Sequence, residues 1–233
     1  MGLGAGLVAA GLGVPLSEGE EGARAGAGWL ALGLVQVCGY AAALGCAFVA
    51  ARVLGGWEGV SGSGGGGGFG RGLMGGLVGW VGAMPWLLVL GIVVGVVGRW
   101  LAEMSGSAAP EVVAHETLRE LVSSGVGAGW WLMVVAVVVG APVIEEVIYR
   151  GFLQGGLVRL LGGRRWWAIV LGAAVFSGVH AGSVDASGFV ILFAVGLVLG
   201  LMRERTGGLT GPVVFHGLFN ASNVALAMLG AGG

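Results

Sequence analysis

The sequence predicts an all-α, polytopic membrane protein with about seven transmembrane helices, and three observations support that fold class. Of the 233 residues, 56% are hydrophobic and only 10% are charged, with a mean hydropathy of +0.95. Soluble domains carry roughly a quarter of charged residues, so this composition excludes an ordinary soluble protein. The charges leave seven long uncharged windows without the two-residue alternation of a membrane β-strand. Because lipid offers no partner for backbone polar groups, these windows are expected to be helices.

Most windows match the roughly 17–25 residues with which a helix crosses a bilayer. They cover residues 1–17, 25–51, 72–98, 121–144, 166–184, 186–202 and 206–233. The first is short and rich in glycine, and a cleaved signal peptide is the rival interpretation of it. That interpretation is disfavoured because no positively charged segment precedes the apolar run.

The arginines indicate how the helices run through the membrane. With the N-terminus in the cytoplasm and seven alternating spans, only Arg24, Arg99 and Arg119 fall outside. The cytoplasmic segments then hold Arg52, Arg71, Arg159, Arg164, Arg165, Arg203 and Arg205. This asymmetry follows the positive-inside rule. The net charge of −1 gives no reason to expect a nucleic-acid partner.

Two connections between the windows are long. Residues 55–71 read as a flexible glycine and serine linker. Within 100–126, the segment PEVVAHETLRELV is expected to form a short amphipathic helix at the membrane surface. His115 and Glu116 resemble half of a zinc-protease HExxH motif, but Arg119 stands at the second histidine position. We therefore interpret them as a solvated polar face.

The first group of unexpected polar residues is EEVIYRGFL, residues 145–153. Ionisable residues inside membrane spans are costly and by default suggest function. Glu146 and Arg150 are four residues apart on a helix, a spacing that permits an ion pair. Glu145 lies about 100° round the helix from Glu146, so we expect the two carboxylates to meet different partners. A buried carboxylate without its own cation is suited to proton transfer.

The second group lies on the window 166–184 and the third on the last window, 206–233. Phe176 and His180 are four residues apart in FSGVHAG, and His216 and Asn220 are four apart in FHGLFNASN. If the helix that carries Glu145 continues to a turn at Gly162–Gly163, an antiparallel hairpin places Glu145 and His180 at one depth. We therefore expect one site built from the last four spans.

This set of side chains can activate water and stabilise an oxyanion. Glu145 and His180 would hold and deprotonate the water, while His216 and Asn220 would donate hydrogen bonds to the negative oxygen of a tetrahedral intermediate. A divalent metal such as zinc, bound by Glu145, His180 and His216, would serve as well, and the sequence leaves both mechanisms open. An aspartyl dyad is excluded because Asp185 is the only aspartate.

Together, Glu145-Glu146-x-x-x-Arg150, Phe176-x-x-x-His180 and His216-x-x-x-Asn220 resemble the three motifs of the CPBP family. This family comprises the CaaX proteases and bacteriocin-processing enzymes, including type II CaaX prenyl endopeptidases and many bacterial members. The motifs are in family order, and the match extends over about 75 residues. Eight spans are typical of the CaaX members, whereas the windows give seven.

The resemblance implies an intramembrane endopeptidase with a cavity open to the cytoplasm. Glu145 would be the catalytic base, helped by His180. His216 and Asn220 would form the oxyanion hole, and Glu146, Arg150 and Phe176 would support the site. It implies a membrane-anchored peptide or protein as substrate, with prenylated CaaX-type peptides as one class. The family has been described both as metalloproteases and as metal-independent glutamate proteases.

We therefore expect residues 1–233 to form one integral-membrane domain of a prokaryotic cytoplasmic membrane. Residues 1–120 would supply N-terminal spans and loops without motifs, and 121–233 the catalytic helical core. Two alternatives from other classes are a proton-coupled transporter, which also uses buried glutamate and histidine, and a catalytically silent immunity or scaffold protein. The halves show no self-similarity of the kind that many transporters have.

Overall fold

The computed structural model describes residues 18–53, 68–107, 127–180 and 184–231, and its regular structure is helical. The helices are α1 (Glu18–Val53), α3 (Phe69–Ser105), α5 (Ala128–Val135), η1 (Ala136–Gly140), α6 (Ala141–Glu146), η2 (Val147–Leu153), α7 (Gln154–Leu160), α8 (Arg165–Val179), α9 (Ala186–Thr206) and α10 (Thr210–Ala231). The segments η1 and η2 are π-helical turns. They interrupt one continuous rod that runs from Ala128 to Leu160.

Five helical segments in the described residues are long and apolar enough to cross a membrane, so the prediction of a helical membrane protein is confirmed. They are Leu30–Arg52, Phe69–Ser105, Ala128–Leu160, Ala186–Thr206 and Thr210–Leu229. Helix α8 is apolar but has only 15 residues. The first window lies outside the described residues, as do most of the 55–71 linker and the segment with His115, Glu116 and Arg119. The count of seven spans therefore stays a prediction.

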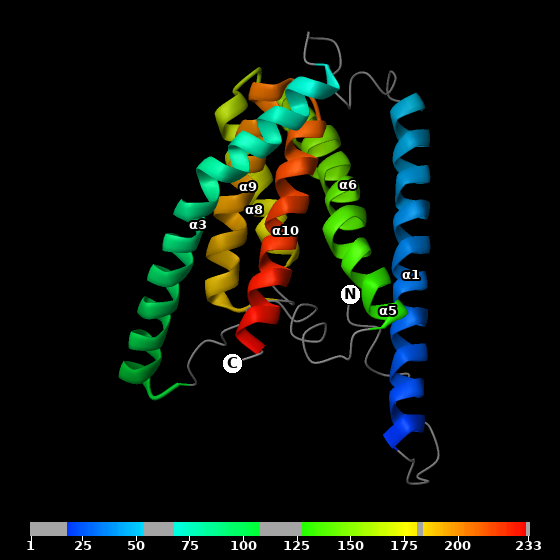
Figure 1. The fold of residues 1–233 in the computed structure, drawn as a ribbon. Coiled ribbons are helices and arrows are strands. Elements are labelled where there is room, and N and C mark those ends of the chain that lie inside the picture. Colours follow the sequence, from blue (N-terminus) through cyan, green and yellow to red (C-terminus); the bar gives the residue numbers. More distant parts are fainter. Residues whose placement is uncertain (1–17, 54–67, 108–126, 181–183, 232–233) are drawn as a thin grey trace.

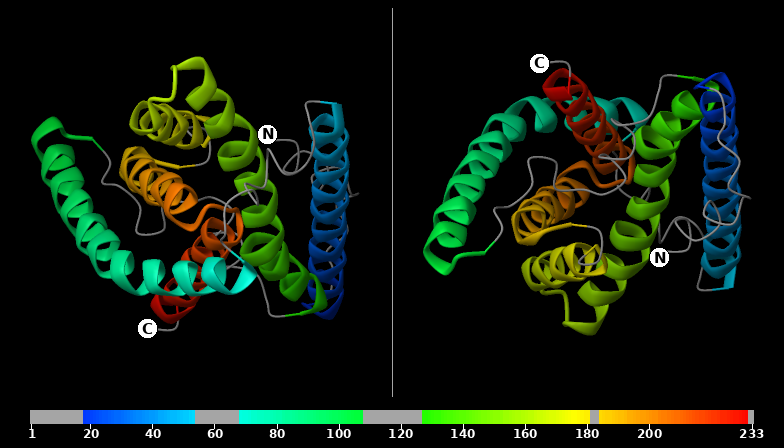
Figure 2. Two further views of the ribbon diagram at one scale, coloured as in Figure 1. Left: turned by 90° about the horizontal axis from the view of Figure 1, so that it is seen from above. Right: turned by 90° about the horizontal axis from the view of Figure 1, so that it is seen from below.

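Helix α9 lies in the middle of the bundle, between α8, α3 and α10 (Figure 2). A buried apolar core joins α3, α9 and α10, and its members are Met84, Leu87, Val195, Leu199, Met202, Phe215 and Phe219. Helix α3 has Pro85 in its interior, and it curves around α9 and α10 (Figure 2). Proline removes one helical hydrogen bond and is a common cause of such bending.

On the other side of the bundle, α1 packs along α5, η1 and α6 (Figure 1). Tyr40 of α1 lies against Gly140 of η1, where a Cβ atom would come within 2.7 Å of the Tyr40 ring. Small residues allow such close approach between membrane helices. The N-terminal helix is thus joined to the rod that carries Glu145 and Glu146.

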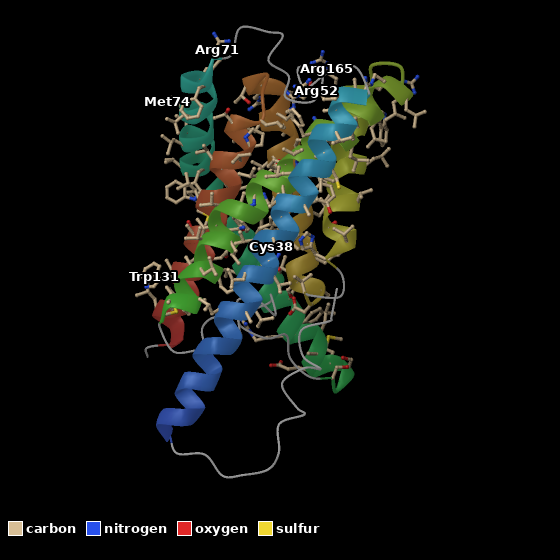
Figure 3. All side chains as sticks on the ribbon, turned by 90° about the vertical axis from the view of Figure 1, so that its right-hand side faces the viewer. Cys38, Arg52, Arg71, Met74, Trp131 and Arg165 are labelled. Atoms are coloured by element: carbon tan, nitrogen blue, oxygen red, sulfur yellow. The ribbon has the colours of Figure 1, made fainter. Side chains whose placement is uncertain are left out.

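One end of the bundle is rich in arginine. Arg52, Arg71 and Arg165 all lie at this end (Figure 3). Helix α9 finishes there with Arg203 and Arg205 in its last turn. The helices therefore bring together the arginines that the alternating arrangement assigned to one side of the membrane. That this side is the cytoplasm stays a prediction.

The turn predicted at Gly162–Gly163 is confirmed. Both glycines have positive φ angles, 61° and 86°, which favour glycine because other residues have a Cβ clash there. The rod ends at Leu160 and α8 begins at Arg165, so the turn joins them as a hairpin. The hairpin returns the chain toward the depth of Glu145, with His180 at the C-terminal end of α8.

Candidate active site

The rod that carries the two glutamates is shaped by a proline. In η1 the amide of Ala141 bonds to the carbonyl of Ala136, five residues back. The next carbonyl in this pattern, that of Val137, would need an N–H from Pro142, which has none. The Nδ2 of Asn220 donates to this Val137 carbonyl at 2.8 Å. The sequence therefore leaves the Val137 carbonyl without a donor within the rod, and it supplies the Asn220 amide of α10 as the donor.

Helix α10 approaches η1 closely at the same level. At Gly217 an added Cβ would lie 2.8 Å from the carbonyl oxygen of Val138, which is closer than real Cβ atoms come. Only glycine fits this approach of one backbone to another. Gly217 directly follows His216 in the sequence, so the contact also fixes the depth at which His216 meets the rod.

Glu146 and Arg150 form a buried ion pair, as their spacing predicted. The Nη1 of Arg150 lies 3.0 Å from Oε1 of Glu146, and the side chains are only 2% and 0% exposed. The Nη2 of Arg150 also donates to the carbonyl of Gly196 in α9 at 3.3 Å. The guanidinium carbon lies 4.7 Å from the centre of the Phe176 ring, a cation–π contact. Arg150 thus ties the rod to α8 and α9.

His216 contacts both glutamates, so the prediction that they meet different partners is wrong. Its Nδ1 lies 2.8 Å from Oε1 of Glu146, and its Nε2 lies 3.8 Å from Oε2 of Glu145. The separation of the side chains round the helix was correctly expected, but an imidazole carries nitrogens on two different edges. One ring can therefore lie between two carboxylates that point in different directions.

The hydrogen bond to Glu146 determines which ring nitrogen of His216 carries a donated proton. A carboxylate only accepts hydrogen bonds, so Nδ1 must carry the proton that is donated to Glu146. Nε2 is then the nitrogen that faces Glu145, within ion-pair range but beyond direct hydrogen-bond distance. Glu146 is buried, whereas the Glu145 side chain is 25% exposed. Of the two carboxylates, Glu145 is the accessible one.

His180 lies beside Phe176 at the end of α8. Its Nδ1 contacts the carbonyl of Phe176 at 2.8 Å and must donate the hydrogen bond, because a carbonyl only accepts. The side chain thereby satisfies a backbone carbonyl in the last turn of the helix. In the neutral ring, Nε2 then carries the lone pair, which is the form that a general base needs.

Phe176 connects the two histidines. Its ring is 1% exposed, and its centre lies 5.0 Å from that of His180 and 5.9 Å from that of His216. Tyr149 packs edge-on against the same ring at 5.2 Å. Phe176 is therefore an apolar wall that contacts both histidines, Tyr149 and Arg150. Its role in supporting a reaction stays a prediction.

Two features of the site had no motif in the sequence. Gln154, one turn beyond Arg150, is 3% exposed and donates to the carbonyl of Gly200 and to Glu204 in α9. Gln154 could have been found from its spacing of four residues from Arg150, which places both side chains on the same face of the helix. Tyr40 of α1 packs against Gly140, which lies five residues before Glu145 on the same rod. No spacing in the sequence links α1 to Glu145.

The metal hypothesis requires Glu145, His180 and His216 to converge as ligands. Among the described residues, no group of three or more histidine, cysteine, aspartate or glutamate side chains is arranged to hold a metal ion. In addition, one ring nitrogen of each histidine already contacts a protein oxygen. The site in this arrangement does not fit a metal centre, and metal dependence stays a prediction.

A bundle of long apolar helices with buried glutamate, histidine and arginine side chains indicates an integral membrane protein. Residues 127–222 match the family described as Type II CAAX prenyl endopeptidase Rce1-like. This segment contains all three motifs, and the match confirms the predicted resemblance to the CPBP proteases.

The chain is also similar to a protein of Escherichia coli described as "Uncharacterized 24.3 kDa protein". The two are 26% identical over 141 residues, which are 57% of this chain and 59% of the relative. The similarity thus spans less than two thirds of the relative's length. No solved structure matches the chain significantly.

Proposed function

We propose that this protein is an intramembrane endopeptidase that hydrolyses a peptide bond of a membrane-associated substrate by means of activated water. The observation that supports this best is the position of His216 between two unlike carboxylates. One carboxylate, Glu146, is buried and neutralised by Arg150. The other, Glu145, is accessible and has no arginine of its own at hydrogen-bond distance in the described structure. The family match of residues 127–222 supports the same activity.

In the proposed reaction, Glu145 is the general base. Its carboxylate accepts a proton from water while the water oxygen attacks the carbonyl carbon of the scissile bond. The carbonyl oxygen becomes an oxyanion, and the C–N bond breaks as the proton passes from Glu145 to the leaving nitrogen. His180 assists by holding the water through its Nε2.

His216 and Asn220 are the proposed donors to the oxyanion. Because Nδ1 of His216 already donates to Glu146, Nε2 can donate to the oxyanion only when the ring carries a proton on both nitrogens. The Nε2 edge faces Glu145, so this donor would lie next to the reacting carbon. Asn220 uses one amide hydrogen for the Val137 carbonyl, and its amide has a second one. Glu146 and Arg150 position His216 without touching the substrate.

The proposed substrate is a membrane-anchored peptide or protein, with prenylated CaaX-type peptides as the first class to test. The arginine-rich end of the bundle would face the cytoplasm, and the substrate would enter from that side. A lipid anchor would keep the peptide at the surface where the site can reach it. These assignments rest on the family and on the charge asymmetry.

Cleavage of a farnesylated fluorogenic CaaX peptide by the protein in liposomes tests the proposal. We expect Glu145→Ala and His180→Ala to abolish cleavage. Ser177→Ala is a matched control, because the buried Ser177 hydroxyl donates to the carbonyl of Ala173 in its own helix. A chelator such as EDTA should leave the rate of the parent unchanged, given the absence of a metal-ligand group among the described residues.

Cleavage at the parental rate by the Glu145 and His180 variants would overturn the assigned roles. Loss of activity in Ser177→Ala alone would indicate a serine mechanism. Chelator inhibition that is reversed by zinc would support the metal mechanism instead of the metal-independent one. Solute uptake into the liposomes without any proteolysis would favour the transporter alternative.

A further inference from the structure

A polar cavity lies at the arginine-rich end of the bundle, and Arg150 lines it whereas Glu146 does not. Its volume is about 220 Å³, and its polar lining residues are Arg150, Gln154, Arg165, Arg203 and Glu204. Pockets for drug-sized ligands have roughly 300–1,000 Å³, so this cavity suits a small group. The proposed reaction does not use it.

The charges around the cavity favour an anion. Arg150 is balanced by Glu146, which lies outside the cavity. Of the remaining charged lining residues, Arg165 and Arg203 are positive and Glu204 is negative, so the lining keeps one net positive charge. The Arg165 guanidinium lies 2.6 Å from a Glu204 oxygen, and its side chain is 68% exposed. An exposed ion pair of this kind contributes little and can be exchanged for another anion.

Glu204 is held at the wall of the cavity by two donors. Its Oε1 accepts from Nε2 of Gln154 at 2.9 Å, and its Oε2 accepts from Arg165. Gln154 in turn donates to the carbonyl of Gly200 and is 3% exposed. A buried, hydrogen-bonded glutamine of α7 and the first arginine of α8 thus hold the carboxylate of Glu204, the one acidic side chain among the described lining residues.

The position of the cavity along the bundle agrees with the level of lipid headgroups. Arg165 is the first residue of α8, so the positive end of that helix dipole lies at the cavity wall. Trp166 and Trp167 follow it and are 55% and 57% exposed. Exposed tryptophans mark the interface between membrane and water. Basic pockets between transmembrane helices at this depth bind anionic headgroups.

We propose that this cavity binds a phosphate group, and specifically the phosphodiester of an anionic membrane lipid such as phosphatidylglycerol. The phosphate oxygens accept hydrogen bonds from Arg165 and Arg203, and the first of these replaces the contact with Glu204. Charge-assisted hydrogen bonds from arginine to phosphate are among the strongest polar contacts in proteins. The lipid would join the ends of α7, α8 and α9, and its binding does not depend on catalysis.

Native mass spectrometry of the detergent-solubilised full chain tests this. Phosphatidylglycerol and phosphatidylcholine are titrated separately, and we expect tighter binding of phosphatidylglycerol. The double variant Arg165→Gln/Arg203→Gln should weaken phosphatidylglycerol binding about tenfold or more, since two charged hydrogen-bond donors are lost. Arg164→Gln is the matched control, because Arg164 is the exposed neighbour of Arg165 and does not line the cavity.

Glu204→Gln is expected to act in the opposite direction. It removes the carboxylate that competes for Arg165, so the affinity for phosphatidylglycerol should rise several-fold. Misfolding cannot produce such a gain, which keeps the proposal testable even if the double variant is unstable. Glu145→Ala should bind phosphatidylglycerol like the parent, and this result separates the lipid site from the proposed protease activity.

Inorganic phosphate distinguishes the source of the anion. If millimolar inorganic phosphate displaces phosphatidylglycerol from the parent, the cavity accepts free phosphate as well. If phosphate does not displace the lipid, the cavity is selective for the lipid. Both results support a site for a phosphate group. Equal phosphatidylglycerol affinity in the parent, the double variant and Glu204→Gln would overturn the proposal.

Discussion

Glu145 and Glu146 are neighbours in the sequence but lie in different electrostatic surroundings, so matched glutamine substitutions should have different effects. Glu146 is 0% exposed and contacts both Arg150 and His216 through Oε1. The Glu145 side chain is 25% exposed, and its contact with His216 is 3.8 Å long. We expect Glu146→Gln to lower stability strongly, and Glu145→Gln to remove activity with little change in stability.

The magnitudes follow from burial. Glu146→Gln leaves the guanidinium of Arg150, 2% exposed, without its counter-charge. Removing one partner of a buried ion pair costs roughly 3–5 kcal/mol. Each kcal/mol lowers Tm by roughly 2–4 °C in a chain of this size, so the expected decrease is on the order of 10 °C. Glu145→Gln should change Tm by no more than about 2 °C, whereas loss of a general base lowers kcat roughly 10²–10⁴-fold.

Thermal unfolding in detergent, followed by tryptophan fluorescence, gives the two Tm values, and peptide cleavage per folded molecule gives the activities. A third variant, Glu146→Gln/Arg150→Met, removes both charges and should recover part of the lost Tm, because a neutral pair leaves no uncompensated charge. A larger decrease in Tm for Glu145→Gln than for Glu146→Gln would refute this reasoning. So would a double variant less stable than Glu146→Gln alone.

Two further predictions concern packing around the site. Asn220→Ala leaves the Val137 carbonyl without its donor and should cost about 1–3 kcal/mol; Asn223→Ala, which removes only a bond within α10, should lower Tm less. Gly140→Ala places a Cβ 2.7 Å from the Tyr40 ring and should cost about 1–3 kcal/mol. Adding Tyr40→Ala should restore part of that loss, and additive effects of the two substitutions would contradict the contact.

The fold class could be predicted from composition because the cost of burying charge in lipid restricts where charged residues stand. Five of the seven apolar windows correspond to long helices, and the paired Gly162–Gly163 marked the hairpin turn. The uncharged window ended at residue 144, but the helix continues to Leu160, as the expected hairpin required. Charges do not end this helix, because Glu146 and Arg150 neutralise each other inside it.

Helical periodicity also selected most of the polar site, since residues four apart share a face. It could not assign partners across helices. That His216 lies between both carboxylates, and that Asn220 satisfies a carbonyl opened by Pro142, depends on the rotation and depth of α10 against the rod. Close backbone contacts such as Gly217 against Val138 set that depth.

The amino-acid sequence alone was thus sufficient to predict a membrane helix bundle and to select a candidate glutamate and histidine site in its C-terminal half. Hydropathy and local residue spacing are properties of the chain itself. Packing of the helices assigned Glu146 to the buried ion pair and left Glu145 accessible. It also placed Tyr40 of α1 against Gly140 of the rod and formed the cavity lined by Arg150 and Glu204. These arrangements join residues distant in sequence, and their geometry exists only once the helices have packed.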